Sequence, residues 1–437
     1  MSNERSGFSS RLGFVLATAG SAVGLGNIWR FPYLAAKYGG GTFLLTYLIL
    51  TLTFGFSLMI TEVALGRKAG TSAIRAFGHF SKKHTFIGYL TTIIPFIIFP
   101  YYCVIGGWVT KYALISLQGG IHNAASDTFF TGFISKSAEP MICVLVFLIA
   151  TTVVVAGGVK GGVERVSTIM MPVLIVLLIG VSLFCITRPG AMAGVAYYLK
   201  PSLKGFGPTT ILAALGQLFY SMSLAMGIMI TFGSYMPKKA DLEKSVTQVE
   251  IFDTGVAFLA GLMIVPAVFV FSNGDSSMLA KGPSLMFVML PKVFDSMAFS
   301  SVIAAVFFIL VLLAALTSSI SLLETLVAVL MDKFHMKRGT ACITMFIIAL
   351  LLAVPSSLGF GAWSNITILG FDFLDFFDFI SNSVLMPIAA FLTCLFVGYI
   401  IKPKVIVDEV ESSGKFKRKS LFLICLLYTS DAADDLI

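Results

Sequence analysis

Residues 20–32 read Gly-Ser-Ala-Val-Gly-Leu-Gly-Asn-Ile-Trp-Arg-Phe-Pro. They lie inside an apolar segment long enough to cross a bilayer, yet three glycines, an asparagine and an arginine interrupt it. Backbone N–H and C=O groups that leave a helix at membrane depth must find partners in protein, water or ligand. We therefore expect a broken membrane helix here, and a binding site built from its main chain.

The whole chain has the composition of a multi-pass membrane protein. Of its 437 residues 57% are hydrophobic and 12% are charged, and the mean hydropathy is +0.95. Apolar runs of about 20 residues, the length needed to cross a bilayer, recur along it. The predicted spans are 11–36, 41–66, 86–118, 140–157, 165–186, 208–236, 245–272, 298–331, 339–354 and 369–401.

The net charge of +8 is a membrane-topology signal and does not indicate nucleic acid binding. Lysines and arginines gather in four loops, 67–83, 238–244, 333–338 and 402–419. The positive-inside rule places these loops and the N-terminus in the cytoplasm. We expect a protein of the cell inner (plasma) membrane, surrounded by lipid. The six cysteines stand singly in apolar stretches, which is typical of inert buried thiols.

A second interrupted span lies five spans after the first. Residues 221–227 read Ser-Met-Ser-Leu-Ala-Met-Gly, with two serines and a glycine at mid-depth. Interrupted spans at matching positions of two halves indicate an inverted repeat with substrate near the midplane. We predict an all-α membrane protein with an inverted 5+5 helix repeat, broken first and sixth helices and a truncated eleventh helix. The predicted parts are a cytoplasmic gate segment (1–10), the first repeat (11–186), the second repeat (208–401), a cytoplasmic loop with the start of the eleventh helix (402–424) and a non-native tail (425–437).

The tail is set apart by its sequence. Residues 425–435 read Cys-Leu-Leu-Tyr-Thr-Ser-Asp-Ala-Ala-Asp-Asp, and aspartates are costly in lipid. The string resembles the translation of a sequencing-library adapter, so we interpret it as an assembly artefact. A genuine polar tail is the alternative.

Four motifs, in this order on the expected spans, resemble the neurotransmitter:sodium symporter family, and its bacterial amino-acid transporters most closely. They are Gly20–Pro32, Gly39–Gly41, Gln217–Gly227 and Leu316–Ser319. The resemblance covers residues 5 to about 400. It implies the leucine-transporter fold and sodium-coupled symport of neutral hydrophobic or aromatic L-amino acids by alternating access.

The resemblance also implies two Na⁺ sites. The first would use the carbonyls of Gly20, Val23 and Ala314 with the hydroxyls of Thr317 and Ser318. The alternative for these hydroxyls is hydrogen bonding to carbonyls of their own helix. The second would use the Ala22 carbonyl, the Asn27 side chain, Ser221 and Asp253.

Asp253 stands in the seventh span, where a carboxylate is expensive and by default functional. A helix-end residue at the membrane interface is the alternative. Family members often carry a neutral asparagine here and need chloride, or an acidic side chain one turn on, where this chain has Ala257. We infer that Asp253 binds Na⁺ and replaces chloride, so that chloride is not required. Tyr47, Gln217 and Ser221 would hydrogen-bond around it.

An amino acid zwitterion needs donors for its carboxylate and acceptors for its ammonium. The N–H groups of Leu25 and Gly26, where a half-helix begins, suit the carboxylate, and Tyr102 looks like the family's carboxylate-binding tyrosine. The ammonium would meet the carbonyls of Ala22, Tyr220 and Ser221 with the Ser223 hydroxyl.

The side-chain pocket implied by family position is apolar and uncharged, which favours neutral substrates. Its members are Ile98, Tyr220, Ser223, Met226, Ser318 and Leu322. Biogenic amines are disfavoured, because Ser21-Ala22 lacks the aspartate that the family's amine carriers place there. Ordinary core packing is the alternative for Met226 and Leu322.

Gate residues follow from the same resemblance. Arg30 would pair with Asp375, or failing that with Asp372, on the outer side, above a lid of Tyr102 and Tyr220. The expected inner gate is Arg5 with Asp332, supported by Phe8, Ser234 and Tyr235.

Gly162 and Pro172, ten residues apart at the fifth span, match the family's spacing for a helix that unwinds inward. A plain kink is the alternative reading of this pair.

Three other functions compete with symport. An amino-acid-binding sensor on the same fold, without concentrative transport, is the main alternative. A channel would need a polar stripe or rings of charge, and an enzyme would need a nucleophile, metal cluster or cofactor motif. The sequence shows neither the channel features nor the enzyme motifs. It does not predict the oligomeric state.

Overall fold

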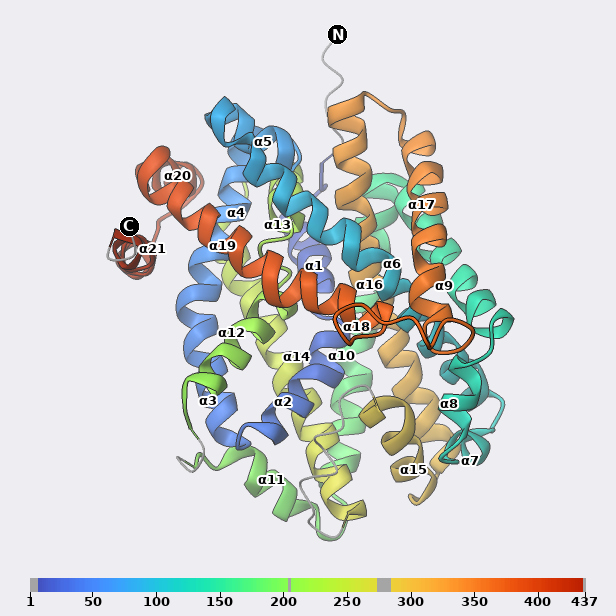
Figure 1. Ribbon diagram of the computed structural model, residues 1–437. Coiled ribbons are helices and arrows are strands. Elements are labelled where there is room, and N and C mark those ends of the chain that lie inside the picture. The colour runs from blue at the N-terminus through green and yellow to red at the C-terminus, as the bar shows by residue number, and fades with distance from the viewer. Residues whose placement is uncertain (1–6, 203–205, 273–283, 435–437) are drawn as a thin grey trace.

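The computed structural model describes residues 7–202, 206–272 and 284–434, and this part of the chain folds into helices (Figure 1). Eight of the described helices are long and apolar enough to cross a bilayer, and a bent pair makes a ninth. The only β pairing in the described ranges is a single bridge between Ile368 and Phe371. The all-α membrane fold predicted from composition is confirmed.

The elements of the first half are α1 (Arg11–Ala22), η1 (Gly26–Arg30), α2 (Phe31–Lys37), α3 (Gly41–Leu50), η2 (Thr51–Gly55), α4 (Phe56–Ala69), α5 (Ala73–Phe80), η3 (Lys82–His84), α6 (Thr85–Leu117), α7 (Ile121–Ala124), α8 (Phe129–Ile134), α9 (Ala138–Ala156), η4 (Val159–Glu164) and α10 (Arg165–Ile186). Those of the second half are α11 (Ala191–Leu199), α12 (Pro208–Ser221), α13 (Ile228–Tyr235), α14 (Leu242–Phe271), η6 (Leu285–Met289), α15 (Leu290–Asp295), α16 (Ser300–Phe334), α17 (Arg338–Leu358), α18 (Phe373–Asp378), η7 (Phe379–Leu385), α19 (Met386–Leu395), η8 (Phe396–Ile400), α20 (Lys404–Glu411) and α21 (Lys419–Asp434). Each predicted span matches one of these helices or a run of them. α21 continues to Asp434, with no break at residue 424.

The start of the described chain, α5 and α20 lie toward one end of the bundle, here called the N-terminal end, and α7, α8, α11 and α15 lie at the other (Figure 1). Three of the basic segments predicted to be cytoplasmic contain α5, α20 and the connection between α16 and α17, and the fourth, 238–244, contacts Arg67 through Lys238 and Ala240, so they gather at the N-terminal end. This distribution is the one that the positive-inside rule requires of a multi-pass protein.

The first and sixth spans are broken as predicted. α1 ends at Ala22, and the chain bends by 52° before the next helix continues from Gly26. α12 ends at Ser221, and α13 begins only at Ile228. Between them Ser223 and Ala225 have φ angles of 53° and 61°, a left-handed conformation that is costly for side-chain-bearing residues.

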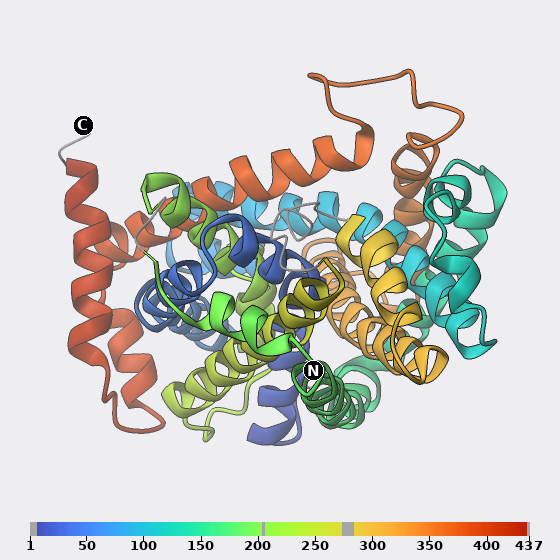
Figure 2. The same ribbon diagram turned by 90° about the horizontal axis from the view of Figure 1, so that it is seen from below.

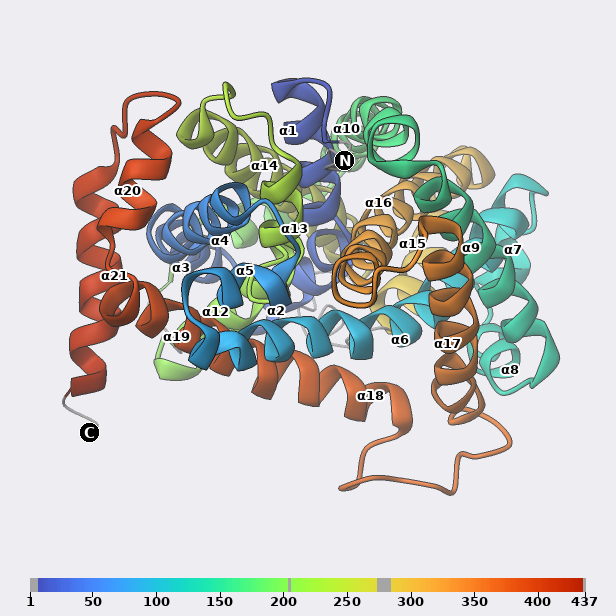
Figure 3. The same ribbon diagram turned by 90° about the horizontal axis from the view of Figure 1, so that it is seen from above.

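Views along the bundle place α2 and α13 in the interior (Figures 2 and 3), where α13 packs against α4 and α16 and α2 packs against α14 and α3. The pairs α6 and α16, α4 and α13, and α10 and α14 pack along one another. The two breaks therefore lie inside protein, where other spans can supply partners for the freed main chain.

Glycines bring α4 and α13 together. A Cβ atom at Gly66 would lie 1.8 Å from the Ile230 carbonyl oxygen, and one at Gly233 would lie 2.3 Å from that of Val63. Small residues that let backbones approach are the usual means of helix association in membranes. α4 thus holds α13 directly behind the break.

We predict that Gly66→Ala destabilises the protein by about 1–3 kcal/mol, the usual cost of overpacking a core. Its thermal unfolding midpoint in detergent should fall by several degrees. Gly180→Ala in α10 is the matched control, since a Cβ there meets nothing within 4 Å. Equal midpoints for the two variants would contradict the tight α4–α13 contact.

Candidate functional site

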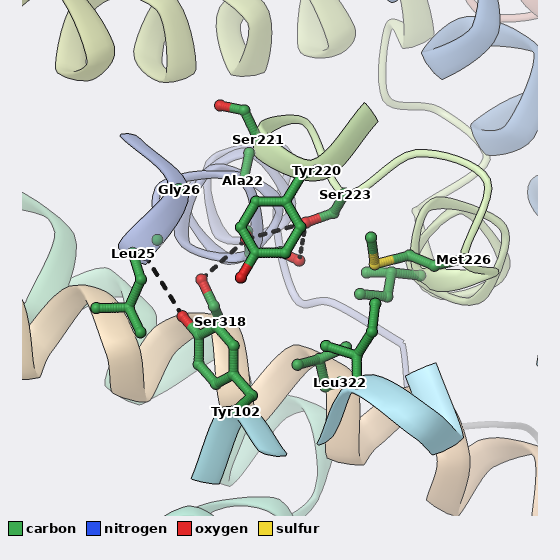
Figure 4. A pocket seen from close by; sticks show the side chains of 14 residues that line it. Ala22, Leu25, Gly26, Tyr102, Tyr220, Ser221, Ser223, Met226, Ser318 and Leu322 are labelled. Atoms are coloured by element: carbon green, nitrogen blue, oxygen red, sulfur yellow. Dashed lines mark hydrogen bonds between the residues drawn. The ribbon is translucent and has the colours of Figure 1, made fainter. Parts of the chain in front are cut away.

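A small cavity of about 30 Å³ lies between the two breaks (Figure 4). Every residue predicted to bind substrate lines it, and Gly24 and Ile228, which the sequence reading missed, line it too. Among these described lining residues none is charged. The members are Ser21, Ala22, Gly24, Leu25, Gly26, Ile98, Tyr102, Tyr220, Ser221, Ser223, Met226, Ile228, Ser318 and Leu322.

Gly24 and Gly26 are glycines because neighbouring side chains occupy the space of a Cβ. At Gly24 a Cβ would lie 2.4 Å from the Ser318 hydroxyl oxygen, and at Gly26 it would lie 2.7 Å from the Tyr220 ring. Between them the backbone N–H of Leu25 points at the Tyr102 hydroxyl, 3.5 Å away. The bare main chain of the first break therefore faces the cavity.

Hydroxyls from two other spans satisfy the Ser21 carbonyl. Ser223 donates to it at 3.0 Å and Ser318 at 3.1 Å, and the hydroxyls of Ser21 and Ser223 lie 3.1 Å apart (Figure 4). An aromatic amino acid, as the family resemblance implies, needs more room than this. Met226 and Leu322 border the cavity (Figure 4), and the flexible methionine can move to provide room.

One cluster of oxygens joins the first break to α16. The Ser318 hydroxyl lies 3.5 Å from the carbonyls of both Gly20 and Val23. The Thr317 hydroxyl lies 3.1 Å from the Ala314 carbonyl of its own helix. Thus the Ser318 hydroxyl reaches from α16 to the break, whereas the hydrogen bonds of the Thr317 hydroxyl, to the carbonyls of Leu313 and Ala314, are the within-helix bonds named above as its alternative. Together they form a buried set of carbonyl and hydroxyl oxygens, the donors preferred by hard cations.

A second cluster surrounds the fully buried Asp253 carboxylate. Asn27 Nδ2 donates to Oδ1 at 2.7 Å, the Ser221 hydroxyl donates to Oδ1 at 2.8 Å and the Tyr47 hydroxyl donates to Oδ2 at 3.0 Å. Gln217 does not join them, because its amide nitrogen donates to the Gly26 carbonyl at 2.9 Å. The expected ring of partners therefore holds for Tyr47 and Ser221 but not for Gln217.

The Asn27 amide is turned with its nitrogen toward Asp253 and its Oδ1 toward the N–H of Gly24, at 3.1 Å. Binding a cation through Oδ1 would require the amide to flip, which exchanges the two atoms. Such a flip is reasonable because the carboxylate alone attracts a donor, whereas a cation between the two side chains attracts an oxygen.

On the outer side, Arg30 stacks over the Tyr220 ring, with 5.2 Å between guanidinium carbon and ring centroid. In the described part of the chain, Arg30 forms no ion pair with Asp375. Tyr101 and Asn382 instead hold Asp378, one helical turn further, through hydrogen bonds of 3.2 and 2.6 Å.

Asp372, the alternative predicted partner of Arg30, is engaged at the start of α18. Asp372 caps α18 by accepting from the N–H of Asp375. We infer that Asp378 is the better candidate for the outer acidic group.

On the inner side, Arg5 lies outside the described residues. Asp332 accepts a 2.7 Å hydrogen bond from the backbone N–H of Ser72. Phe8 is buried and donates its backbone N–H to the Tyr235 carbonyl at 3.0 Å. The Ser234 hydroxyl donates to the Thr231 carbonyl.

The Tyr235 side chain reaches a charged pair that the sequence reading missed. Its hydroxyl donates to Glu324 at 2.8 Å, and Arg338 binds both oxygens of the same carboxylate at 2.6 and 2.9 Å. This network ties α13 to α16 and α17.

The predicted unwinding pair lies where the fifth span changes its winding. Gly162 falls in the π-helical turn η4, and a Cβ there would lie 1.9 Å from the Val154 carbonyl oxygen. Pro172 lies inside α10. Next to Gly162, the Glu164 carboxylate accepts from the N–H and the hydroxyl of Ser9 at 2.8 and 2.6 Å, which fastens the start of α1 to this turn.

Among the buried carboxylates that the sequence reading missed, Glu324 and Glu62 are fully buried within membrane spans. One Glu62 oxygen accepts from the N–H of Ala225 in the sixth-span break at 2.8 Å. Both residues carried the signal that identified Asp253, an acidic side chain within an apolar span.

Comparison with known proteins places these features in a family. The model of the sodium:neurotransmitter symporter family matches residues 5–131 and 128–434. An uncharacterised sodium-dependent transporter of Bacillus subtilis (strain 168) is 36% identical over 93% of this chain and 90% of its own. One from Haemophilus influenzae is 35% identical over 96% and 93%. The crystal structure of MhsT in complex with L-phenylalanine matches with a TM-score of 0.90 and 38% identity, over 98% of each chain.

The first oxygen cluster yields a testable prediction. Thr317→Val keeps the shape of the side chain and removes one oxygen, so the Na⁺ concentration for half-saturation should rise about tenfold, equivalent to about 1.4 kcal/mol. Equilibrium binding of radioactive sodium to the purified protein measures it. Thr325→Val is the control, because it removes a buried hydroxyl from the same helix, bonded to the Ser321 carbonyl, about two turns away from the oxygen cluster. Equal sodium affinities for both variants would rule out a role for Thr317.

Proposed function

The chain belongs to the sodium:neurotransmitter symporter family, and from this premise we propose that it imports neutral hydrophobic or aromatic L-amino acids with Na⁺ by alternating access. The observation that carries the substrate class is the cavity of Figure 4: it is uncharged, and it is lined by the main chain of the first break, by serine and tyrosine hydroxyls, and by the apolar side chains of Ile98, Met226 and Leu322. The family neighbour that crystallised with L-phenylalanine supports an amino acid of this kind.

The zwitterion is proposed to bind across the first break. The Leu25 N–H and the Tyr102 hydroxyl, already 3.5 Å apart, would share its carboxylate. Carbonyls of Ala22, Tyr220 and Ser221, together with the Ser223 hydroxyl, would accept from its ammonium. A charged side chain would find no partner among the described lining residues, which is costly in a buried site.

Coupling to Na⁺ is proposed to arise from shared groups. Residues 20–27 supply carbonyls to both oxygen clusters and N–H groups to the substrate, so each ligand would help to fix the conformation that the others need. Such mutual stabilisation is a coupling free energy between sites, and it acts in both directions.

Alternating access is proposed to use the two ends of the broken helices. On one side Arg30, Tyr220 and Asp378 would close over the cavity. On the other, Arg5 and Asp332 would act with the Phe8 and Tyr235 contacts. The unwinding of η4 at Gly162 would open a path from the N-terminal end, taken to be cytoplasmic, and residues 11–186 and 208–401 would be the two repeats.

Chloride independence is proposed from Asp253. Within the described residues its carboxylate accepts hydrogen bonds from the neutral side chains of Asn27, Ser221 and Tyr47, and Ala257, one turn on, carries no charge. A fixed negative charge beside the second oxygen cluster supplies what chloride would otherwise bring.

Uptake into proteoliposomes tests the function. An inward Na⁺ gradient should drive accumulation of labelled L-phenylalanine, which unlabelled L-leucine or L-tyrosine should inhibit and L-lysine or L-glutamate should not. Tyr102→Phe should raise the half-saturating substrate concentration tenfold to a hundredfold, since a hydrogen bond to a charged group contributes about 1.5–3 kcal/mol. Binding without accumulation would indicate a sensor instead.

The chloride prediction uses the same vesicles. Replacing chloride by gluconate should leave uptake by the unsubstituted protein unchanged. Asp253→Asn should lose at least nine-tenths of uptake in gluconate, because no negative charge remains beside the cluster, and Asp253→Asn with Ala257→Glu should recover part of it. Chloride-dependent uptake by the unsubstituted protein would refute the proposal.

A further inference from the structure

The loop from Gly359 to Asp372, here called the α17–α18 loop, projects sideways from the helix bundle (Figures 2 and 3). Figure 1 shows it at the end of α17, nearer the middle of the molecule than α7 or α15. Since α14 and α16 run upright in this view, sideways means along the plane of the membrane. The loop therefore extends toward lipid, close to the level at which α17 ends.

The base of the loop is fixed to the protein. Phe360 packs edge-on against Trp108, with ring centroids 5.4 Å apart. A Cβ at Gly361 would lie 2.1 Å from the Ser135 carbonyl oxygen, so the backbones there are in contact. The outward direction of the loop is thus set by packing at its root.

The tip is a tight hairpin turn. Ile368 and Phe371 exchange both backbone hydrogen bonds, at 2.9 and 3.0 Å. Leu369 and Gly370 between them have φ angles of 53° and 85°. Two central residues with positive φ make a type I′ turn, which favours Asn, Asp or Gly at both positions.

Leu369 occupies the first of these positions, where leucine is unfavourable because the turn requires a positive φ angle. The left-handed conformation costs a residue with a Cβ about 1–2 kcal/mol. The Leu369 side chain gains no burial in return, since it is 80% exposed, the largest fraction among the exposed hydrophobic residues of the described chain. Strain kept at an exposed position points to a function for the side chain.

The rest of the loop has the composition of a membrane interface. Trp363, Ile366 and Phe371 are also exposed, and Phe371 stacks on Phe379 of η7 at 5.4 Å. The loop contains no lysine or arginine, and its one acid, Asp372, is at the α18 end. Aromatic and apolar side chains without charge gather where headgroups meet acyl chains.

We propose that the α17–α18 loop is an interfacial anchor, with Leu369 and Phe371 inserted at the acyl boundary of the leaflet at this end of the bundle. The partner is the lipid surface itself. The backbone sets the depth: the N–H groups of Leu369 and Gly370 need acceptors, which headgroup and glycerol oxygens supply and hydrocarbon does not. Because α18 follows directly, the anchor also holds the segment that carries Asp378 at a constant level. The proposal does not depend on the transported substrate.

A nitroxide label on Leu369→Cys tests insertion in proteoliposomes. Collisions with oxygen should exceed those with a water-soluble nickel chelate, whereas a label on Asn123→Cys, an exposed position of α7, should show the reverse. The native cysteines of the described chain are buried or half-buried, and unsubstituted protein measures their background labelling.

A second variant separates anchoring from folding. Leu369→Asn suits the turn better than leucine, so it should preserve the loop while it removes the apolar tip. Brominated phosphatidylcholine quenches the fluorescence of tryptophans that contact lipid, and the contribution of Trp363 is the quenching that is lost in Trp363→Phe. This contribution should fall at least twofold in Leu369→Asn.

Three results would overturn the anchor. One is a label at 369 that meets the nickel chelate as often as the label at 123. Another is unchanged Trp363 quenching in Leu369→Asn. The third is spin–spin broadening at 369 that disappears on dilution with unlabelled protein, which would assign the tip to a contact between two copies of the chain.

Discussion

Main-chain groups that leave a helix inside a bilayer must be paired, and residues 20–27 meet this requirement with partners for their main chain from three other spans and a partner for a side chain from a fourth. The Ser21 carbonyl receives hydroxyls from α16 and from the sixth-span break. The Gly26 carbonyl receives the Gln217 amide of α12, and the Leu25 N–H points at Tyr102 of α6. Asn27 is fastened to Asp253 of α14. The break thus organises the helices around it, because each of them supplies something that it lacks.

Three buried carboxylates show how differently the protein treats negative charge. Glu324 is neutralised by Arg338 through two close contacts. Glu62 meets a single backbone donor, at Ala225. Asp253 meets three neutral donors and no cationic side chain among the described residues. Burying a charge without a counter-charge is expensive, and a bound cation at the second oxygen cluster would remove that cost. In the proposed cycle, this cost of burying the Asp253 charge would therefore favour Na⁺ binding.

Close approach of backbones is the other recurring device. Gly66 and Gly233 let α4 pack against α13, and Gly24 and Gly26 let side chains reach the first break. The glycines in the opening motif therefore serve contact as much as flexibility. At Leu369 the chain instead uses leucine in a left-handed turn, and its side chain is exposed. An exposed apolar side chain at this level of the protein can be buried in lipid.

Much of the fold and site could be read from the sequence, because span length follows bilayer thickness and because Gly, Ser, Asn and Asp in an apolar segment mark positions that cannot face lipid. The spans, both breaks and the buried position of Asp253 came from that reasoning, whereas the lining residues came from the resemblance to the symporter family. Other features depend on helix rotation and on competition for partners, which no one-dimensional pattern contains. Asp375 and Asp378 are one turn apart in sequence, and only packing shows that Tyr101 and Asn382 hold the latter. Gln217 and the Asn27 amide likewise took the partners that lay nearest in space. The sequence by itself determined which groups must be buried and paired, and the tertiary structure decided which partner each one has, because a hydrogen bond depends on distances of a few tenths of an ångström that only packing sets.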